Sequence, residues 1–195
     1  LELEVLVLNK LMWEQIMGII KTKDRELQLI RKIISAGCKE IIDSQNISKY
    51  LTEINGYSKE LYEHSINVGI LSLIVGINSC DNKKYLLELF TSALLHDYGK
   101  LNIPKRILEK RDVLTKSERS EMEKHPSCGY QFLKQDNKLS REVLLGILDH
   151  HERVDGRGYG NGKCEEEISK LAKTIMIADV YDAMISDRVY RKRIG

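Results

Sequence analysis

The sequence predicts an almost entirely α-helical domain, and three observations support this fold class. After residue 58, every long segment has apolar residues at helical spacing and begins near a side chain that can cap a helix. No alternating pattern typical of a strand follows residue 10. Only 2 of the 195 residues are proline, and a content of 42% apolar and 31% charged residues indicates a folded chain rather than a disordered one.

The first part of the chain is less regular than the rest. Residues 1–8, LELEVLVL, alternate as a strand does, and helical spacing follows them. A helix capped by Asp24 is expected to run through Ile34. We therefore divide the chain into residues 1–22, a short strand and helix extension or the end of a sensor or linker, and residues 23–195, a helical domain. An ordinary N-terminal part of the core is an equal alternative for the first segment.

Five helices are expected in the rest of the chain, each with its own start signal. They are residues 59–77 after Ser58, 82–100 after Asp81, 119–126 after the capping box of Thr115 and Glu118, 141–152 after Ser140, and 170–187 after Ser169. Pro126 is expected to end the third helix or to begin another, because proline fits the first helical turn but not the interior.

Composition and charge exclude several functions. A net charge of +2 is too small for a protein that binds a nucleic-acid polymer through a basic surface. The best apolar stretch, INVGILSLIVGI, is too short to span a membrane, and LELEVLVL lacks the basic start of a signal peptide. Since no initiating methionine is present, a fragment of a longer protein is expected. Four cysteines occur without a C-x-x-C pair, which favours reduced thiols in the cytoplasm over disulfides: Cys38, Cys80, Cys128 and Cys164.

The five histidines all lie near a helix end or beside a carboxylate: His64, His96, His125, His150 and His151. Glu60 lies one helical turn before the first of them, and Asp97 directly follows the second. Asp179 lies in the otherwise apolar segment TIMIADVYDAM, where a carboxylate is costly unless it is paired or binds a metal. Each residue alone has an ordinary explanation, such as a surface pair or a satisfied core histidine.

Taken together, these side chains indicate a metal site. Imidazoles and carboxylates without thiolates are the ligands of manganese, iron or zinc in hydrolytic sites. Adjacent ligands on one helix diverge by about a quarter-turn, so the pairs His96–Asp97 and His150–His151 suit a cluster of metals. Two ions roughly 3.5–4 Å apart that share a carboxylate are the arrangement for in-line attack on phosphorus.

Five ordered motifs in residues 58–191 resemble those of the HD-GYP family, a branch of the HD phosphohydrolases. They are EHSINVG, LLHDYGKLNIPKRIL, LTKSERSEMEKHPSCGYQFL, DHHERVDGRGYG and IADVYDAMISDRVYRK. The resemblance implies a helical bundle with a metal site in its core. It also implies a phosphodiesterase that hydrolyses cyclic di-GMP to linear pGpG or GMP in bacterial signalling, with two or three divalent ions, iron or manganese, as cofactors.

The resemblance implies roles for individual residues. The implied metal ligands are Glu60, His64, His96, Asp97, His125, His150, His151 and Asp179. Asp97 would bridge the ions, Glu60 would serve a third ion, and Lys100 would contact the scissile phosphate beside Asp97 as the second catalytic residue. Further substrate contacts are implied at Asp182, Arg188 and Arg191. The loop Gly156–Gly162 would be a surface for protein partners, and a homodimer is a further expectation.

Departures from the family pattern leave alternatives open. The signature Gly-Tyr-Pro reads Gly158-Tyr159-Gly160, so this loop, the expected surface for partners, is expected to be more mobile than in the family. Tyr98 replaces the usual isoleucine after the HD pair, and the domain is expected to be short at its C-terminal end. The alternatives are a phosphohydrolase for another cyclic dinucleotide or nucleotide, and a catalytically weak regulatory module that acts through protein partners.

Overall fold

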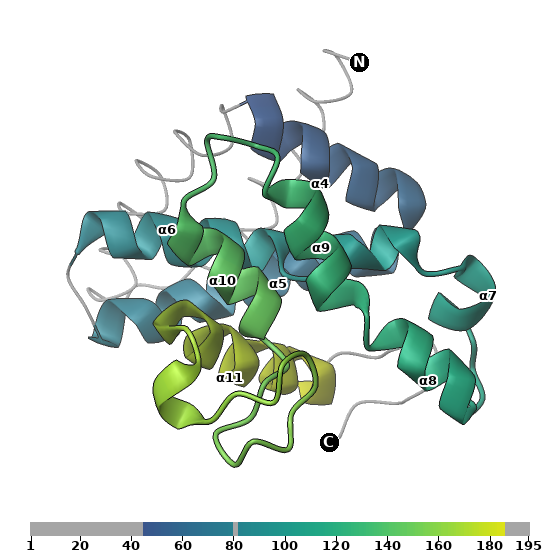
Figure 1. Ribbon diagram of the computed structural model, residues 1–195. Helices are drawn as coiled ribbons and strands as arrows, with labels where there is room; N and C mark the ends of the chain where they lie inside the picture. Colours follow the sequence, from purple (N-terminus) through teal and green to yellow (C-terminus); the bar gives the residue numbers. More distant parts are fainter. Residues whose placement is uncertain (1–44, 80–81, 186–195) are drawn as a thin grey trace.

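The computed structural model describes residues 45–79 and 82–185, and within these residues it contains helices and no strand (Figure 1). This confirms the predicted all-α class. The elements are α4 (Gln45–Tyr57), α5 (Lys59–Ser79), α6 (Lys83–Leu95), η2 (Tyr98–Asn102), α7 (Lys105–Leu108), α8 (Lys116–Met122), α9 (His125–Leu133), α10 (Arg141–Asp149), η3 (Glu165–Glu167) and α11 (Lys170–Ile185). The expected N-terminal extension, the helix after Asp24, and Arg188 and Arg191 lie outside the described residues.

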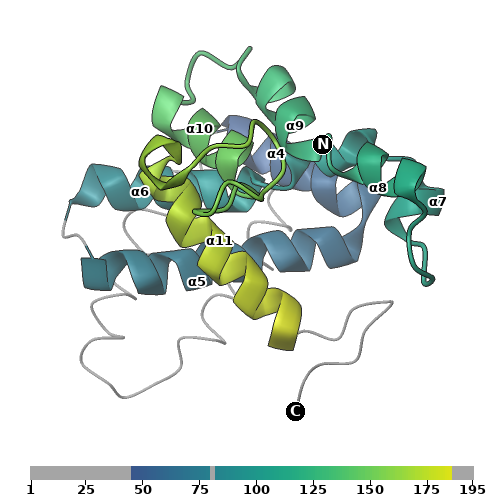
Figure 2. The ribbon, with the colours of Figure 1, turned by 60° about the horizontal axis from the view of Figure 1, so that its bottom comes forward.

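Helices α5 and α6 form the base on which the other elements pack. The two lie side by side in both ribbon views, and α11 crosses α5 (Figures 1 and 2). Helix α10 contacts α6, α9 and α11, and α9 contacts η2. The largest apolar cluster contains Phe90 and Leu94 of α6, both almost fully buried, against Ile54 of α4 and Ile66 of α5. Burial of this area is the main stabilising term for such a bundle.

The start signals read from the sequence hold with one correction. The capping box of Thr115 and Glu118 is present at α8, and Ser140 caps α10 by accepting a hydrogen bond from Val143 N. The cap of α6 is Asn82, whose side chain accepts from Tyr85 N, and not Asp81, which lies outside the described residues. Both residue types can cap, and the helix begins one residue later than expected.

Boundaries near three histidines differ from the expected ranges. The helix expected over 82–100 ends at Leu95 in α6, and His96 is its C-cap. The helix expected over 119–126 is α8 (Lys116–Met122), which ends before His125. Pro126 lies in the first turn of α9, so it begins a new helix that starts at His125. Helix α10 ends at Asp149 rather than at residue 152, and His150 is its C-cap. All three histidines therefore lie at helix ends.

A close crossing of backbones fixes the distance between η2 and α9. An added Cβ at Gly99 would lie 1.9 Å from the carbonyl oxygen of His125 and 2.6 Å from Gly129 N. These distances are far inside van der Waals contact, so only glycine fits at position 99. Because Asp97 lies just before this crossing and His125 within it, the contact also sets how close these two side chains come.

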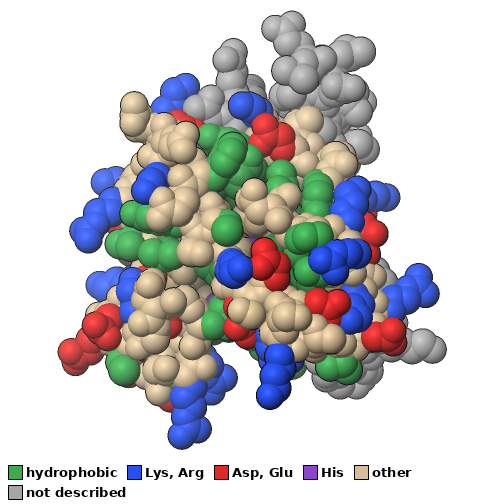
Figure 3. Space-filling view, turned by 45° about the vertical axis from the view of Figure 1, so that its right-hand side comes forward, with side chains coloured by type: hydrophobic (Ala, Val, Ile, Leu, Met, Phe, Trp, Pro, Cys, Tyr) green, Lys and Arg blue, Asp and Glu red, His purple; other side chains and the backbone are tan. Residues whose placement is uncertain are grey.

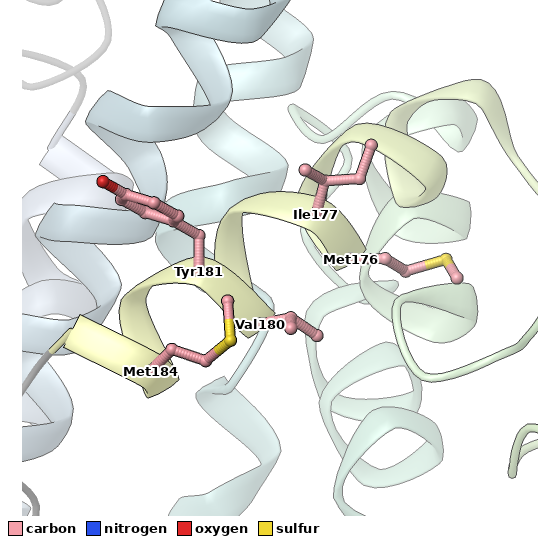
Figure 4. Close-up of a pocket in the computed structure, with 5 residues that line it drawn as sticks. All are labelled: Met176, Ile177, Val180, Tyr181 and Met184. Atoms are coloured by element: carbon pink, nitrogen blue, oxygen red, sulfur yellow. The ribbon is translucent and has the colours of Figure 1, made fainter. Parts of the chain in front are cut away.

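One face of α11 is apolar and open to solvent. Met176, Ile177, Val180, Tyr181 and Met184 line a shallow hollow of about 350 Å³ on this face (Figure 4). Ile177 and Val180 are 62% and 57% exposed, so this stripe is not part of the core. None of the described helices, α11 included, is both long enough and apolar enough to cross a membrane.

Replacing Gly99 by alanine should destabilise the fold, because the methyl group would force η2 and α9 apart. We expect the free energy of unfolding to fall by at least about 2 kcal/mol, measured by urea denaturation. Gly56→Ala is the matched control: it lies near the end of α4 with nothing within 4 Å of the added Cβ, so stability should stay equal or rise by up to about 1 kcal/mol. Equal effects of the two substitutions would contradict the close crossing.

Candidate metal centre

Three of the histidines are oriented by a backbone carbonyl three residues earlier, which belongs to the same helix for His96 and His150 and to the end of α8 for His125. The Nδ1 atoms of His96, His125 and His150 each lie 2.7 or 2.8 Å from the carbonyl oxygen of the third residue before. Because a carbonyl oxygen can only accept a hydrogen bond, each Nδ1 carries the proton and each Nε2 presents a lone pair. This is the tautomer that binds a metal through Nε2.

The side chains form two adjacent groups, and within each group the ligand atoms lie within 4.8 Å of one another. One group consists of His64, His96 and Asp179, and the other of Asp97, His125, His150 and His151. They come from α5, the end of α6, α9, the end of α10, and α11. The groups touch, since the ring centroids of His96 and His150 are 4.9 Å apart. The structure thus brings together every implied ligand except Glu60, which is exposed on the first turn of α5 and lies in neither group.

The carboxylate of Asp97 lies between the two groups and faces both. Its Oδ1 is 3.1 Å from His125 Nε2, and its Oδ2 is 3.3 Å from His96 Nε2 and 3.5 Å from His64 Nε2. The residue is fully buried. One oxygen for each group is the geometry of a carboxylate shared by two ions.

Burial and charge keep the site ready for cations. Burial raises the pKa of Asp97, but the neighbouring His96 and Lys100 outweigh it and hold that pKa well below its usual range. Burial lowers the pKa of His150 well below its usual value, helped by His151, and lowers the pKa of His151 to about 3. At neutral pH these imidazoles are uncharged and the carboxylate is ionised, which is the state that ligates metals.

The donor atoms fit metal ions and fit a metal-free core poorly. His125 Nε2 and His150 Nε2 lie 3.2 Å apart, and since both Nδ1 atoms hold the ring proton, no hydrogen bond can join them. His96 Nε2 is buried and makes no hydrogen bond within the described part of the chain. Facing lone pairs without a proton are unfavourable in a buried site unless a cation lies between them. The residues present therefore fit the divalent ions that such a site implies.

A comparison with known protein families identifies the domain that holds this cluster, because residues 46–195 match the HD domain. The chain belongs to the HD domain family. Its curated relatives include cyclic di-GMP phosphodiesterase PdeB of Borreliella burgdorferi, 39% identical over 66% of this chain and 34% of that protein. Cyclic di-GMP phosphodiesterase PA4108 of Pseudomonas aeruginosa is 32% identical over 86% of this chain and 42% of that protein.

Two further comparisons concern a relative named for a different substrate and a solved structure of the same branch of the family. A relative in Vibrio cholerae, named 3′3′-cGAMP-specific phosphodiesterase 3, is 33% identical over 66% of this chain and 28% of that protein. The solved structure of Bd1817, an HDG"Y"P protein from Bdellovibrio bacteriovorus, aligns with a TM-score of 0.55 at 28% identity, over 63% of this chain and 40% of that one. These relatives confirm the HD-GYP type of HD domain, and the chain spans less than half of the length of each.

A second carboxylate of this HD domain holds His64. Asp182 lies one turn after Asp179 on α11, is 2% exposed, and its Oδ2 lies 2.7 Å from His64 Nδ1. Its Oδ1 accepts a hydrogen bond from Asn67 Nδ2 at 3.0 Å. The structure therefore places Asp182 behind a ligand, whereas the sequence suggested that it contacts substrate. A carboxylate in this position orients the imidazole and raises its basicity.

The expected catalytic lysine of the HD domain lies beside the shared carboxylate. Lys100 Nζ is 2.6 Å from Asp97 Oδ2, and its side chain is 15% exposed.

Burial lowers the pKa of His64, but its hydrogen bonds to Asp179 and Asp182 raise that pKa above the usual value. The centre thus combines one fixed cation with several carboxylates, and it remains open at Lys100.

The signature loop after His151 is built around a buried glutamate that the sequence analysis did not single out. Both carboxylate oxygens of Glu152 accept backbone hydrogen bonds, Oε1 from Asn161 N at 2.5 Å and Oε2 from Lys163 N at 3.0 Å. Tyr159 stacks on His151 with ring centroids 4.5 Å apart, and its N–H donates to the carbonyl oxygen of His151. The loop therefore covers one side of the metal centre. The adjacent letters HHE in the sequence were the available signal.

The glycines of this loop serve two purposes. Gly156, Gly160 and Gly162 have φ values of +70°, +131° and +67°, which favour glycine. Gly158 does not; there, an added Cβ would lie 2.4 Å from Arg153 N. Position 160 is the family's proline, and proline fixes φ near −65°. The loop therefore follows a path here that the family residue could not take.

A pocket of about 570 Å³ opens beside the metal centre, and we call it the entry pocket. Its inner lining includes Lys100, His125, His151, Tyr159 and Asp179. Most of its other lining residues lie in the segment 107–122, which includes α8 (Figure 1). On the face shown in Figure 3, lysine and arginine side chains are spread widely and almost no histidine surface is visible. The volume is typical of a site for a small molecule.

Metal stoichiometry should depend on Asp97 more than on any single histidine. Since its two oxygens face the two groups, Asp97→Ala should reduce binding of both ions, whereas His64→Ala should weaken mainly one, measured by elemental analysis after anaerobic reconstitution. Glu60→Ala should retain the wild-type stoichiometry, because Glu60 lies in neither group. Asp155→Ala, on the exposed loop, is the control. Full stoichiometry in Asp97→Ala would exclude the shared carboxylate.

Restoring the family proline should harm this loop rather than stiffen it. In Gly160→Pro the ring cannot adopt a φ of +131°, and its Cβ would meet Glu152 Oε1 at 2.8 Å. We expect a loss of stability of roughly 1–3 kcal/mol, seen as a lower melting temperature. The control is Gly162→Asn, since asparagine tolerates positive φ and nothing lies within 4 Å of an added Cβ there. A proline variant more stable than wild type would show that the loop takes another path.

Proposed function

We propose that this chain carries a metal-dependent phosphodiesterase activity that hydrolyses cyclic di-GMP. The observation that carries the proposal is the position of Asp97, with one carboxylate oxygen toward each histidine group. A carboxylate shared between two cation sites is the arrangement that supports attack on a phosphodiester. Substrate names come from the relatives, several of which are cyclic di-GMP phosphodiesterases.

The charge of the entry pocket supports a phosphate-containing substrate. Lys100 lies at the metal centre, and three more basic side chains line the pocket: Lys110, Arg111 and Arg119. Two acidic residues line it as well, of which Asp179 belongs to the metal-binding groups. Cationic side chains beside a metal site favour binding of anions such as phosphodiesters.

The chain's own residues would divide the work of the reaction. Two divalent ions, which we propose to be iron or manganese, would activate water for attack and neutralise charge on the phosphoryl oxygens. Lys100 would hold a fixed positive charge beside the scissile phosphate. Asp182 would keep His64 in the ligating tautomer. Tyr159, stacked on His151, would limit access of bulk water from the loop side.

Residues beyond α11 are part of the same proposal. Arg188 and Arg191 remain proposed substrate contacts, on the strength of the family motif alone. Asp182, in contrast, is buried against His64 and Asn67, so we assign it to positioning the ligand rather than to binding substrate.

A second candidate substrate is 3′3′-cGAMP. The relative in Vibrio cholerae with that specificity is 33% identical over 66% of this chain. This identity lies between the 32% and 39% of the two cyclic di-GMP phosphodiesterases. Both substrates are cyclic dinucleotides with two 3′–5′ phosphodiesters, so the metal centre alone does not distinguish them. The distinction depends on the bases, which the pocket walls would contact.

One assay tests the proposed function directly. Protein loaded with manganese or with iron under anaerobic conditions is incubated with cyclic di-GMP and, separately, with 3′3′-cGAMP, and the products are separated by chromatography. We expect linear pGpG with a 5′-phosphate, followed by GMP, and no product from Asp97→Asn. A fully metallated protein that cleaves neither dinucleotide would refute the enzyme and favour the regulatory module.

Lys100→Ala should reduce turnover without removing metal. Loss of one fixed donor at the developing charge is expected to lower kcat by about 10²-fold or more, by analogy with oxyanion-hole donors. Lys124→Ala is the control, because Lys124 is exposed and paired with Glu121 outside the pocket. Unchanged kcat in Lys100→Ala, or products that carry a 3′-phosphate, would contradict the role assigned to Lys100.

A further inference from the structure

One wall of the entry pocket is basic and was not assigned a role by the sequence motifs. It is formed by residues 107, 108 and 110–114, among which Asp112 is acidic, and by Arg119 and Met122 of α8. Met122 lies one helical turn after Arg119, and His125 of the metal centre follows three residues later. All three side chains line the same pocket. Arg119 of α8 therefore lines the space that leads to the metal ligands.

The charges on this wall differ in how far they are already neutralised. Lys110 pairs with Glu118, with Nζ 2.5 Å from Oε2, so its charge is used within the wall. Arg111 and Arg119 are both exposed, and neither makes an ion pair with a residue of 45–79 or 82–185. Their guanidinium groups are the charges of the wall that remain available to an anionic ligand.

A cyclic dinucleotide presents two phosphodiesters, and only one can be attacked at a time. The scissile phosphate would lie at the metal ligands and Lys100, so the second phosphate needs a cation elsewhere in the pocket. Arginine suits this task, because its planar guanidinium binds two phosphate oxygens at once. Resting on the proposed function, we propose that Arg119, together with Arg111 of the same pocket lining, binds the phosphate that is not being cleaved.

This assignment concerns substrate binding and leaves the chemical step to other residues. A contact made equally in the ground state and the transition state changes KM and leaves kcat. It also gives the site a preference for substrates with two phosphates over simple phosphodiesters. Lys100 should show the opposite pattern, since its charge lies beside the metal centre.

The test compares two substrates in three variants. Arg119→Met, Arg111→Met and the double variant are assayed with cyclic di-GMP and with bis(p-nitrophenyl) phosphate, which has one phosphate. We expect KM for cyclic di-GMP to rise about 10- to 100-fold in the double variant, with kcat and the activity on bis(p-nitrophenyl) phosphate little changed. Arg119→Lys should show a smaller rise. Arg141→Met, an exposed arginine at the start of α10 outside the pocket, is the control.

A binding measurement separates this inference from the proposed function. The affinity for cyclic di-GMP is measured by calorimetry on metal-loaded Lys100→Ala, with and without Arg119→Met, and a 10-fold or larger loss is expected. If wild-type protein cleaves cyclic di-GMP and the arginine variants match it in KM and affinity, this inference is wrong and the enzyme stands. If wild-type protein binds cyclic di-GMP through Arg119 without cleaving it, the proposed activity is wrong and the phosphate site stands. Absence of binding refutes both, and equal losses on both substrates refute the second-phosphate site.

Discussion

The buried carboxylate of Asp97 is the constraint on which the rest of the site depends. An ionised group in a fully buried position is costly unless cations or hydrogen bonds compensate for the lost water. Here Lys100 lies 2.6 Å from one oxygen, and histidine Nε2 atoms lie 3.1–3.5 Å from both oxygens. His96 and Lys100 hold the pKa of this carboxyl well below its usual range, so both contribute to the compensation within the described chain. Divalent ions held by the two groups would complete this compensation, and folding of the core would then be coupled to metal binding.

Helix ends solve the problem of orienting the ligands. A histidine at the end of a helix can donate its Nδ1–H to the carbonyl oxygen three residues earlier. This oxygen is available because the last carbonyl groups of a helix have no backbone N–H partner within the helix. This local hydrogen bond turns Nε2 outward from the helix end toward the centre. The close crossing at Gly99 then brings the end of α6 within reach of α9, so separate helix ends meet at one point.

Carboxylates behind the ligands extend the site to the surrounding fold. Asp182 holds His64 from α11, and Glu152 holds the loop that places Tyr159 on His151. Asp149 accepts from Lys163 Nζ and Ser169 N, which ties the end of the loop to α10. Each is almost fully buried and satisfied, as buried polar groups must be. The positions of the metal-binding side chains therefore depend on these carboxylates as well as on the helices that carry the ligands.

The sequence by itself determined the all-α class, most helix starts, and the identity of the side chains that gather at the centre, because caps, apolar spacing and residue chemistry are local properties. It also pointed to Asp97 as the shared carboxylate, through a family motif. It could not show that Glu60 is exposed, that Asp182 turns to His64, or that Glu152 anchors the loop, because these depend on how helices distant in the chain are rotated against one another. The basic wall at Arg119 has the same origin: only the tertiary structure brings Arg119 of α8 into the lining of the pocket beside the metal centre. Tertiary structure decided which charges meet, since the direction of a side chain follows from the packing of its whole helix.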